Sequence, residues 1–273
     1  MSIIEKLTSI DRRIIYLMIG LVVLVPFFIH ISLPIYVSPP VQSVYDYVEA
    51  LPKGSVVMMG FNFGPATMPE LYPMCLAFLR HGYSRGLKVI GMTLNSSAAT
   101  IGDDAMKLVA QEYGYEELKD YVYLGYKPDT RRVMLGIGED ISGPFPTDYM
   151  NRPLSRIPMM KNVKNYKDIA LVMDFGSANS PEWWVTYAGS RHHEKIAAGC
   201  TGVMVSGLYP YLKAGQLIGL VGGLKGAAEY EKLVEKPGKA TLGMNVQSIA
   251  HIAIILMIIL ANVTYFLSRR RAS

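Results

Sequence analysis

The stretch Ile249–Leu267 reads IAHIAIILMIILANVTYFL and decides the architecture of the chain. It contains no Asp, Glu, Lys or Arg, and three arginines follow it after Ser268. A helix needs about 20 apolar residues to cross the hydrocarbon core of a bilayer. The polar side chains of Asn262 and Thr264 can bond to the helix backbone or to a neighbouring helix. The stretch therefore predicts a transmembrane helix over residues 248–267, followed by a basic tail.

A second apolar run, Ile14–Leu33, lies near the other end of the chain, directly after Asp11-Arg12-Arg13. It is longer than the hydrophobic region of a signal peptide, and no small-x-small cleavage site follows it. A proline within it, Pro26, is tolerated in a membrane helix as a kink. We therefore predict a first, uncleaved transmembrane helix over residues 14–34.

Positive charge lies on the terminal side of both apolar runs. The positive-inside rule then places both termini, residues 1–13 and 268–273, in the cytoplasm. The segment 35–240 is predicted to be an extracytoplasmic domain at the cell (plasma) membrane. Much of the net charge of +5 sits in these flanks, which favours anionic lipid headgroups over nucleic acid as the partner.

The segment between the two runs alternates short apolar runs with amphipathic helical patterns, and its length suits one domain. Continuous apolar runs are typical of strands buried on both faces. Such units imply right-handed crossovers and a parallel sheet. The sequence therefore predicts a three-layer, doubly wound α/β domain. Its strands are expected at Ser55–Met59, Leu87–Leu94, Tyr121–Leu124, Asp168–Met173 and Lys195–Thr201.

Polar residues follow several of these strands. Ligands of open parallel sheets bind beyond the carboxyl ends of the strands. The candidate ligand-binding residues are therefore Asn62, Asn95, Asp174 and Ser177, with Asp174 as a base or a ligand anchor. The alternative is that these residues only cap helices and close turns, which Asn, Ser, Thr and Asp commonly do.

Several motifs of common enzyme classes are absent: the sequence has no GxxxxGK[ST], GxGxxG, HExxH or CxxC. His192-His193-Glu194 has the residue types of a metal site, but a solvated loop is the favoured interpretation, so neither metal nor cofactor is predicted. His30 and His251 lie near the outer ends of the two runs, where a plain interfacial anchor is favoured over a functional role.

The two cysteines are too few for a disulfide framework. Cys75 falls on a helical core stripe and Cys200 follows an apolar strand. Both are predicted to be buried and unpaired, rather than one of them forming a nucleophilic dyad with His81 or His193.

The run Gly215–Gly226 reads GQLIGLVGGLKG and is expected to open a glycine-rich helix that reaches Val234. Each interior glycine costs a helix about 1 kcal/mol relative to alanine. Close packing against the sheet, another subunit or a ligand must offset that cost. The packing residues are Gly219, Gly222, Gly223 and Gly226.

Three stretches, Phe61–Glu70 (FNFGPATMPE), Asp120–Pro128 (DYVYLGYKP) and Ala214–Glu231 (AGQLIGLVGGLKGAAEYE), resemble an uncharacterised family of membrane-anchored microbial proteins. The resemblance covers most of the domain. It implies membrane anchoring and brings no activity, cofactor or catalytic residue.

Two functions remain open. The first is a non-catalytic structural or assembly subunit of a membrane complex, with the lipid bilayer, itself or other membrane proteins as partners. The alternative is a membrane-anchored hydrolase or small-ligand receptor that uses the strand-end rim around Asp174. A deep pocket at Asn62, Asn95 and Asp174 would favour the second function, and a flat or filled rim, with apolar surface on the glycine helix, would favour the first.

Overall fold

The computed structural model describes residues 11–29 and 33–272 of the chain. These residues fall into two units. Residues Ile35–Thr241 form one of them, called here the α/β unit. The terminal unit joins Met1–Pro34 to Leu242–Ser273.

The terminal unit contains α2 (Arg12–Phe28) and most of α11 (Lys239–Ala272). Among the described residues, one helix is long and apolar enough to cross a membrane, namely Lys239–Leu267 with a mean hydropathy of 2.2. The other predicted span, residues 14–34, is only partly helical, because α2 ends at Phe28 after 17 residues. His30 lies outside the described residues.

A proline lies near the carboxyl end of the N-terminal helix. Pro26 lies inside α2 and lacks the N–H that would bond to the preceding turn. Three residues later, Ile29 is extended, and its N–H donates to the Val25 carbonyl at 3.1 Å. At the other end, the Asp11 carboxylate caps the helix by accepting from the Arg13 N–H at 2.9 Å.

The α/β unit is built on a sheet of six parallel strands in the order β3-β2-β1-β4-β5-β6. The predicted parallel α/β fold is therefore confirmed. The strands are β1 (Val56–Asn62), β2 (Lys88–Thr93), β3 (Tyr121–Tyr126), β4 (Leu171–Gly176), β5 (Ile196–Cys200) and β6 (Leu220–Gly222). The chain winds outward from β1 to β3, returns to the centre at β4 and winds outward again.

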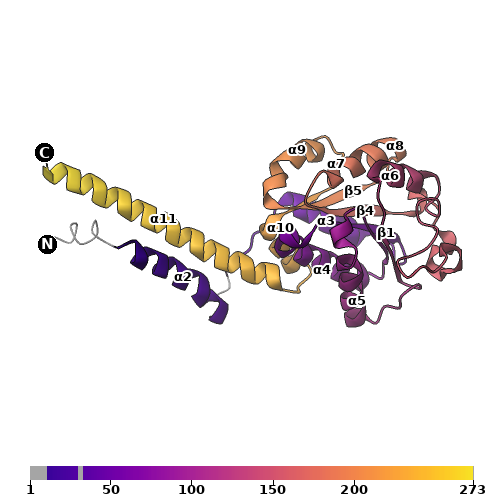
Figure 1. Cartoon of the computed structure of the whole chain (residues 1–273), viewed down its shortest axis with the longest axis horizontal. Helices are drawn as coiled ribbons and strands as arrows, with labels where there is room; N and C mark the ends of the chain where they lie inside the picture. Colours follow the sequence, from indigo (N-terminus) through magenta and orange to yellow (C-terminus); the bar gives the residue numbers. More distant parts are fainter. Residues whose placement is uncertain (1–10, 30–32, 273) are drawn as a thin grey trace. The chain divides into compact units, whose positions relative to one another are not determined.

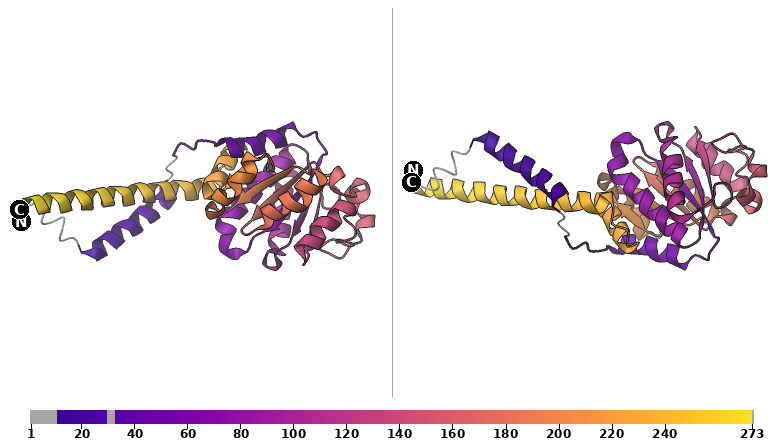
Figure 2. Two further views of the ribbon diagram at one scale, coloured as in Figure 1. Left: turned by 90° about the horizontal axis from the view of Figure 1, so that it is seen from above. Right: turned by 90° about the horizontal axis from the view of Figure 1, so that it is seen from below.

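Helices cover both faces of this sheet because the two windings run in opposite directions and each crossover is right-handed (Figure 1). One face carries α3 (Pro39–Ala50), α4 (Met68–Ser84), α5 (Ile101–Tyr113) and α10 (Gly223–Leu233). The other carries α6 (Thr130–Glu139), α7 (Ser180–Trp184), a π-helical turn (Val185–Gly189), α8 (Ser190–His192) and α9 (Val205–Lys213). The views of Figure 2, from above and from below, each show helices lying over the strands.

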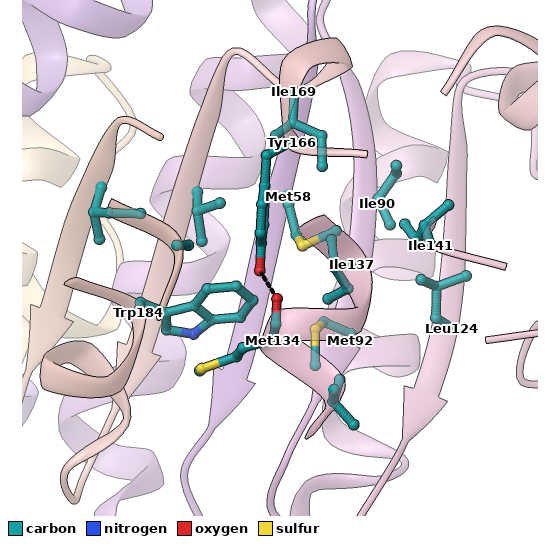
Figure 3. Packing of buried hydrophobic residues seen from close by; sticks show 14 of the residues in the cluster. Met58, Ile90, Met92, Leu124, Met134, Ile137, Ile141, Tyr166, Ile169 and Trp184 are labelled. Atoms are coloured by element: carbon teal, nitrogen blue, oxygen red, sulfur yellow. Dashed lines mark hydrogen bonds between the residues drawn. The ribbon is translucent and has the colours of Figure 1, made fainter. Parts of the chain in front are cut away.

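The core under α6 and α7 holds Trp184 and Tyr166, two of the largest fully buried side chains (Figure 3). Trp184 is fully buried there, and the Tyr166 hydroxyl donates to the Met134 carbonyl at 2.7 Å. Met58 and Ile90 meet them from the sheet. Full burial of such a side chain stabilises the fold by roughly 1.5–3 kcal/mol, so this face anchors the helices that follow β3 and β4.

The glycine run does not form the predicted continuous helix, and that prediction is wrong. Leu220–Gly222 is the edge strand β6, whose Leu220 pairs with Ala198 of β5. The helix α10 begins only at Gly223, which has a φ of +60°. A short apolar run such as this fits a strand as well as a buried helix, because periodicity alone does not separate the two.

Candidate functional site

The carboxyl ends of β1 and β4 meet at the centre of the sheet, where the strand order reverses. Ligands of doubly wound folds bind at such a switch point. Two of the predicted residues lie here, since Asn62 ends β1 and Asp174 lies within β4. Asp174 was expected just after the strand, but the strand continues to Gly176.

Asp174 is completely buried and accepts three hydrogen bonds. Its Oδ1 accepts from Asn62 Nδ2 at 2.5 Å and from Trp184 Nε1 at 3.1 Å. Its Oδ2 accepts from Ser180 Oγ at 2.7 Å. Burial raises the pKa of Asp174 to about 7, although these hydrogen bonds favour the charged form and oppose the shift.

Asn62 is held in the orientation that this network requires. Its Oδ1 accepts from the Leu94 N–H at 2.7 Å and lies 3.4 Å from the Thr93 hydroxyl. The amide nitrogen must therefore face Asp174, and Asn62 joins the ends of β1, β2 and β4. Its side chain is a cross-strand brace, with only 5% of the residue exposed.

The space around Asp174 is filled by the protein itself. A Cβ on Gly60 would overlap Asp174 Oδ1, and a Cβ on Gly176 would overlap Ser180 Oγ. The two glycines thus admit the carboxylate and its partners without leaving room beside them. This is a filled strand-end rim, and Asp174 reaches a ligand only if the rim opens.

The other two predicted residues are not part of this network. The Asn95 side chain accepts from Ser97, from the N–H at 3.0 Å and from the hydroxyl at 2.7 Å. Ser177 contributes its backbone N–H to the Asn62 carbonyl at 3.2 Å. Asn95 therefore caps a short 3₁₀ turn, and Ser177 closes the loop after β4, as the alternative interpretation expects.

Both cysteines are free and fully buried, which confirms that prediction. Burial raises the pKa of Cys75 well above its ordinary value and that of Cys200 to about 12. Thiols that stay protonated are poor nucleophiles.

The four packing glycines all lie against parts of the α/β unit itself. A Cβ on Gly219 would come within 2.6 Å of the Pro40 carbonyl oxygen, and one on Gly222 would overlap Val205. For Gly223 and Gly226, the neighbours of a Cβ would be Gly202 and Val221, each at 3.0 Å. The close packing was predicted correctly, and the neighbours belong to the same chain.

A second constellation, on α10, was not predicted from the sequence. Glu229 is 1% exposed, and its Oε2 accepts from the Ser38 N–H at 2.9 Å and from the Ser38 hydroxyl at 2.5 Å. One turn back along the helix, Lys225 pairs with the same carboxylate. Nearby, Lys232 Nζ donates to the Ile35 carbonyl at 2.5 Å. These contacts hold the segment that leads from α2 into the α/β unit.

Glu231, on the same helix, holds the segment that leads out toward α11. It is 2% exposed, and its Oε2 accepts from the Gly238 N–H at 2.9 Å and the Thr241 N–H at 2.8 Å. Its Oε1 accepts from the Ala240 N–H at 3.1 Å. A carboxylate thus satisfies the free N–H groups at the start of α11 and complements the helix dipole.

The charged residues of α10 escaped prediction because their spacing carries no signal. Glu229 and Glu231 lie two apart on a helix, which reads as ordinary solvated surface. The one usable hint was Ser38 before Pro39-Pro40, a capping pattern at the start of α3. Its partner, however, lies 191 residues further along the chain.

A histidine under α10 ties it to the other helices of that face. The His81 ring lies between the Tyr230 hydroxyl, 2.8 Å from Nδ1, and Glu49 Oε1, 2.9 Å from Nε2. Tyr45 stacks on it with the ring centroids 4.4 Å apart. Burial lowers the pKa of His81, and the Glu49 hydrogen bond opposes the shift. This cluster connects α3, α4 and α10.

A separate cavity of about 230 Å³ lies at the amino ends of β5 and β6, away from the predicted rim. His193 and Glu194 of the predicted loop line it, together with Ser190 and Gln216. Burial raises the pKa of Glu194 to about 8, and the residue beside it, His193, has a φ of +59°.

Comparison with protein-family models, with curated proteins and with solved structures finds no match, so the resemblance to a membrane-anchored family stays a prediction.

Proposed function

We propose that this chain is a membrane-anchored, extracytoplasmic α/β domain that serves as a structural or assembly subunit of a membrane complex. The observation that carries the proposal is the pair of buried carboxylates on α10. Glu229 binds the segment that enters the unit, and Glu231 binds the segment that leaves it. A single helix thus fixes both connections to the apolar ends of the chain.

Two anchors are part of this proposal. The apolar part of α11 supplies one of them. The run from Ile14 supplies the other, with α2 (Arg12–Phe28) as its described helical part and Pro26 as a tolerated kink within it. The arginines at the terminal side of both runs favour a cytoplasmic location for the termini, which leaves the α/β unit outside.

The filled rim supports a non-catalytic role. A catalytic carboxylate must contact its substrate, whereas Asp174 is fully buried and its two oxygens are occupied by Asn62, Ser180 and Trp184. The three donors make Asp174 a structural link between β1, β4 and α7.

One observation favours the alternative, a hydrolase or ligand receptor built around Asp174. A pKa near 7 in a carboxyl group at a switch point is typical of an acid–base residue. For this role, the loop from Ser177 to Ser180 would have to move away and admit a ligand.

Membrane fractionation of the full chain tests the proposal. The chain should stay in the membrane pellet after an alkaline carbonate wash, and after mild detergent extraction it should migrate as a particle larger than one copy of 30.2 kDa in its detergent micelle. Release by carbonate would contradict the anchoring, and a monodisperse single copy would contradict the assembly role.

A further inference from the structure

The apolar part of α11 exposes the imidazole ring of His251 and the side-chain amide of Asn262. The Asn262 amide nitrogen donates to the Ile258 carbonyl at 2.9 Å. Among the described residues, no hydrogen bond reaches the Asn262 side-chain oxygen or the His251 ring. Polar groups in hydrocarbon are costly unless they pair with a neighbouring helix or face water. Asn262 therefore indicates a contact that one copy of the chain leaves unfilled, whereas His251, near the outer end of the run, can also face water.

The two residues lie on the same side of α11. Residues spaced alternately by four and three form one stripe, which is the 3.5-residue repeat of a left-handed helix pair. Ile255 and Ile258, between them on that stripe, are each 55% exposed. The full stripe is Met244, Ser248, His251, Ile255, Ile258, Asn262 and Tyr265.

The opposite side of α11 differs. Val246 and Thr264 lie there and are only 7% and 6% exposed. The Thr264 hydroxyl is satisfied by its own helix, through the Leu260 and Ala261 carbonyls at 2.9 Å. Within Ile249–Leu267, the exposed imidazole and amide groups of His251 and Asn262 thus both lie on the stripe and not on the opposite side.

The other apolar helix of the chain does not supply that partner. Between Ile14 and Phe28, α2 reads IIYLMIGLVVLVPFF, and Tyr16 is the one hydrogen-bonding side chain in it. His251 and Asn262 are 11 residues apart, which corresponds to about 16 Å along a helix axis. A single tyrosine cannot meet both groups.

A second copy of α11 can provide a partner for both His251 and Asn262. Copies of one chain insert with the same topology, so their α11 helices run parallel at the same depth. Each Asn262 then faces the other Asn262, and an amide is both donor and acceptor. His251 likewise faces His251. Such an isologous two-fold contact is self-complementary, and a core asparagine is known to fix register in helix pairs.

We propose that two copies of this chain pair in parallel through the α11 stripe centred on His251, Ile255, Ile258 and Asn262. This inference rests on the membrane anchorage and assembly role proposed above, and it identifies the partner as a second copy.

Disulfide trapping of the full chain in native membranes tests the pairing. The native thiols, Cys75 and Cys200, are fully buried and give a silent background. Ile258→Cys places a thiol on the stripe, and Leu260→Cys places one at nearly the same depth on the opposite side. Oxidation with copper phenanthroline should link Ile258→Cys into a dimer several-fold more efficiently than Leu260→Cys. Equal yields, or a cross-linked product of another mass, would overturn the proposal.

A second substitution isolates the role of the amide. Asn262→Leu, added to Ile258→Cys, should lower the dimer yield several-fold, whereas Thr264→Val on the opposite side should leave it unchanged. An unchanged yield with Asn262→Leu refutes pairing through this amide. A carbonate wash of the same membranes separates the two proposals. Release of the chain by carbonate would refute both the anchoring and the pairing. If the chain stays anchored but the Ile258→Cys variant remains monomeric after oxidation, only the pairing is refuted.

Discussion

The buried carboxyl group of Asp174 makes the stability of the α/β unit depend on pH. Its pKa of about 7 in the folded chain exceeds the value of about 3.9 in an unfolded one. The folded state therefore binds the proton more tightly, so the stabilisation is complete below about pH 4 and is lost as the pH rises through 7.

Asp174→Asn keeps the shape and removes this titration. Between pH 5 and pH 8 the wild type should lose a few kcal/mol of stability that the variant keeps, because one pKa unit is worth about 1.4 kcal/mol. The unfolding midpoint of the variant should therefore rise relative to that of the wild type over this range. Thermal unfolding of both proteins across this range checks the prediction. The pKa of Glu194 is also raised, but Glu194 is present in both proteins, so its contribution cancels in the difference between them. Parallel curves would show that Asp174 does not carry the dependence.

The sequence predicted which individual residues lie at the carboxyl ends of the strands, but not which residues they bind. An acid at the end of an apolar run suggested the switch point, and Asp174 and Asn62 do meet there. The indole nitrogen of Trp184 belongs to the same network, and nothing in the local sequence around Trp184 indicates this contact. Hydrogen bonds between residues far apart in the chain leave no local pattern, so Glu229 and Glu231 were missed for the same reason.

Among the elements, α10 carries the connections to both ends of the chain. Glu231→Gln replaces one carboxylate oxygen with an NH₂ group that cannot accept, and leaves buried N–H groups at the start of α11 unpaired. Each such loss costs about 1–3 kcal/mol. Denaturant unfolding in detergent should show a loss of this size, while Glu235→Gln, an exposed residue just beyond α10, should show none. Equal stability of the two variants would contradict the capping role.

Gly223, at the start of α10, tests whether the glycine packing is internal. Gly223→Leu must place a side chain at a φ of +60° and against Gly202, 3.0 Å from its Cβ. Strain and overpacking together should cost roughly 2–4 kcal/mol. Because the neighbours belong to the same chain, oligomer size in detergent should not change. Gly207→Leu is the control, since Gly207 has open space around it. A smaller oligomer at wild-type stability would place the contact between subunits.

The sequence predicted the central strands of the sheet more reliably than the strand at its edge. The five predicted strands all exist, because each is a continuous apolar run buried on both faces. The sixth, β6, has only three residues. A strand so short has no period of its own, and its neighbouring glycines looked like part of a helix. Pairing with β5, a tertiary contact, decides its conformation.

For the molecule as a whole, orientation across the membrane is the main prediction. Ser142 is exposed in the α/β unit, and the charge pattern places that unit outside the cytoplasm. A membrane-impermeant thiol reagent should therefore label Ser142→Cys in intact cells. The wild type, with Cys75 and Cys200 buried, should not react. Labelling that begins only after the cells are broken would reverse the orientation.

The arrangement on α10 also sets how the molecule bears mechanical load. A force that separates Ile35 from Thr241 enters at Lys232 and leaves at Glu231, two neighbouring residues of one helix. The tension therefore crosses about one residue of α10 and bypasses the sheet. A pull on the two apolar ends of the chain would therefore load these polar contacts before it strained a strand, so the contacts shield the sheet of the α/β unit from that force.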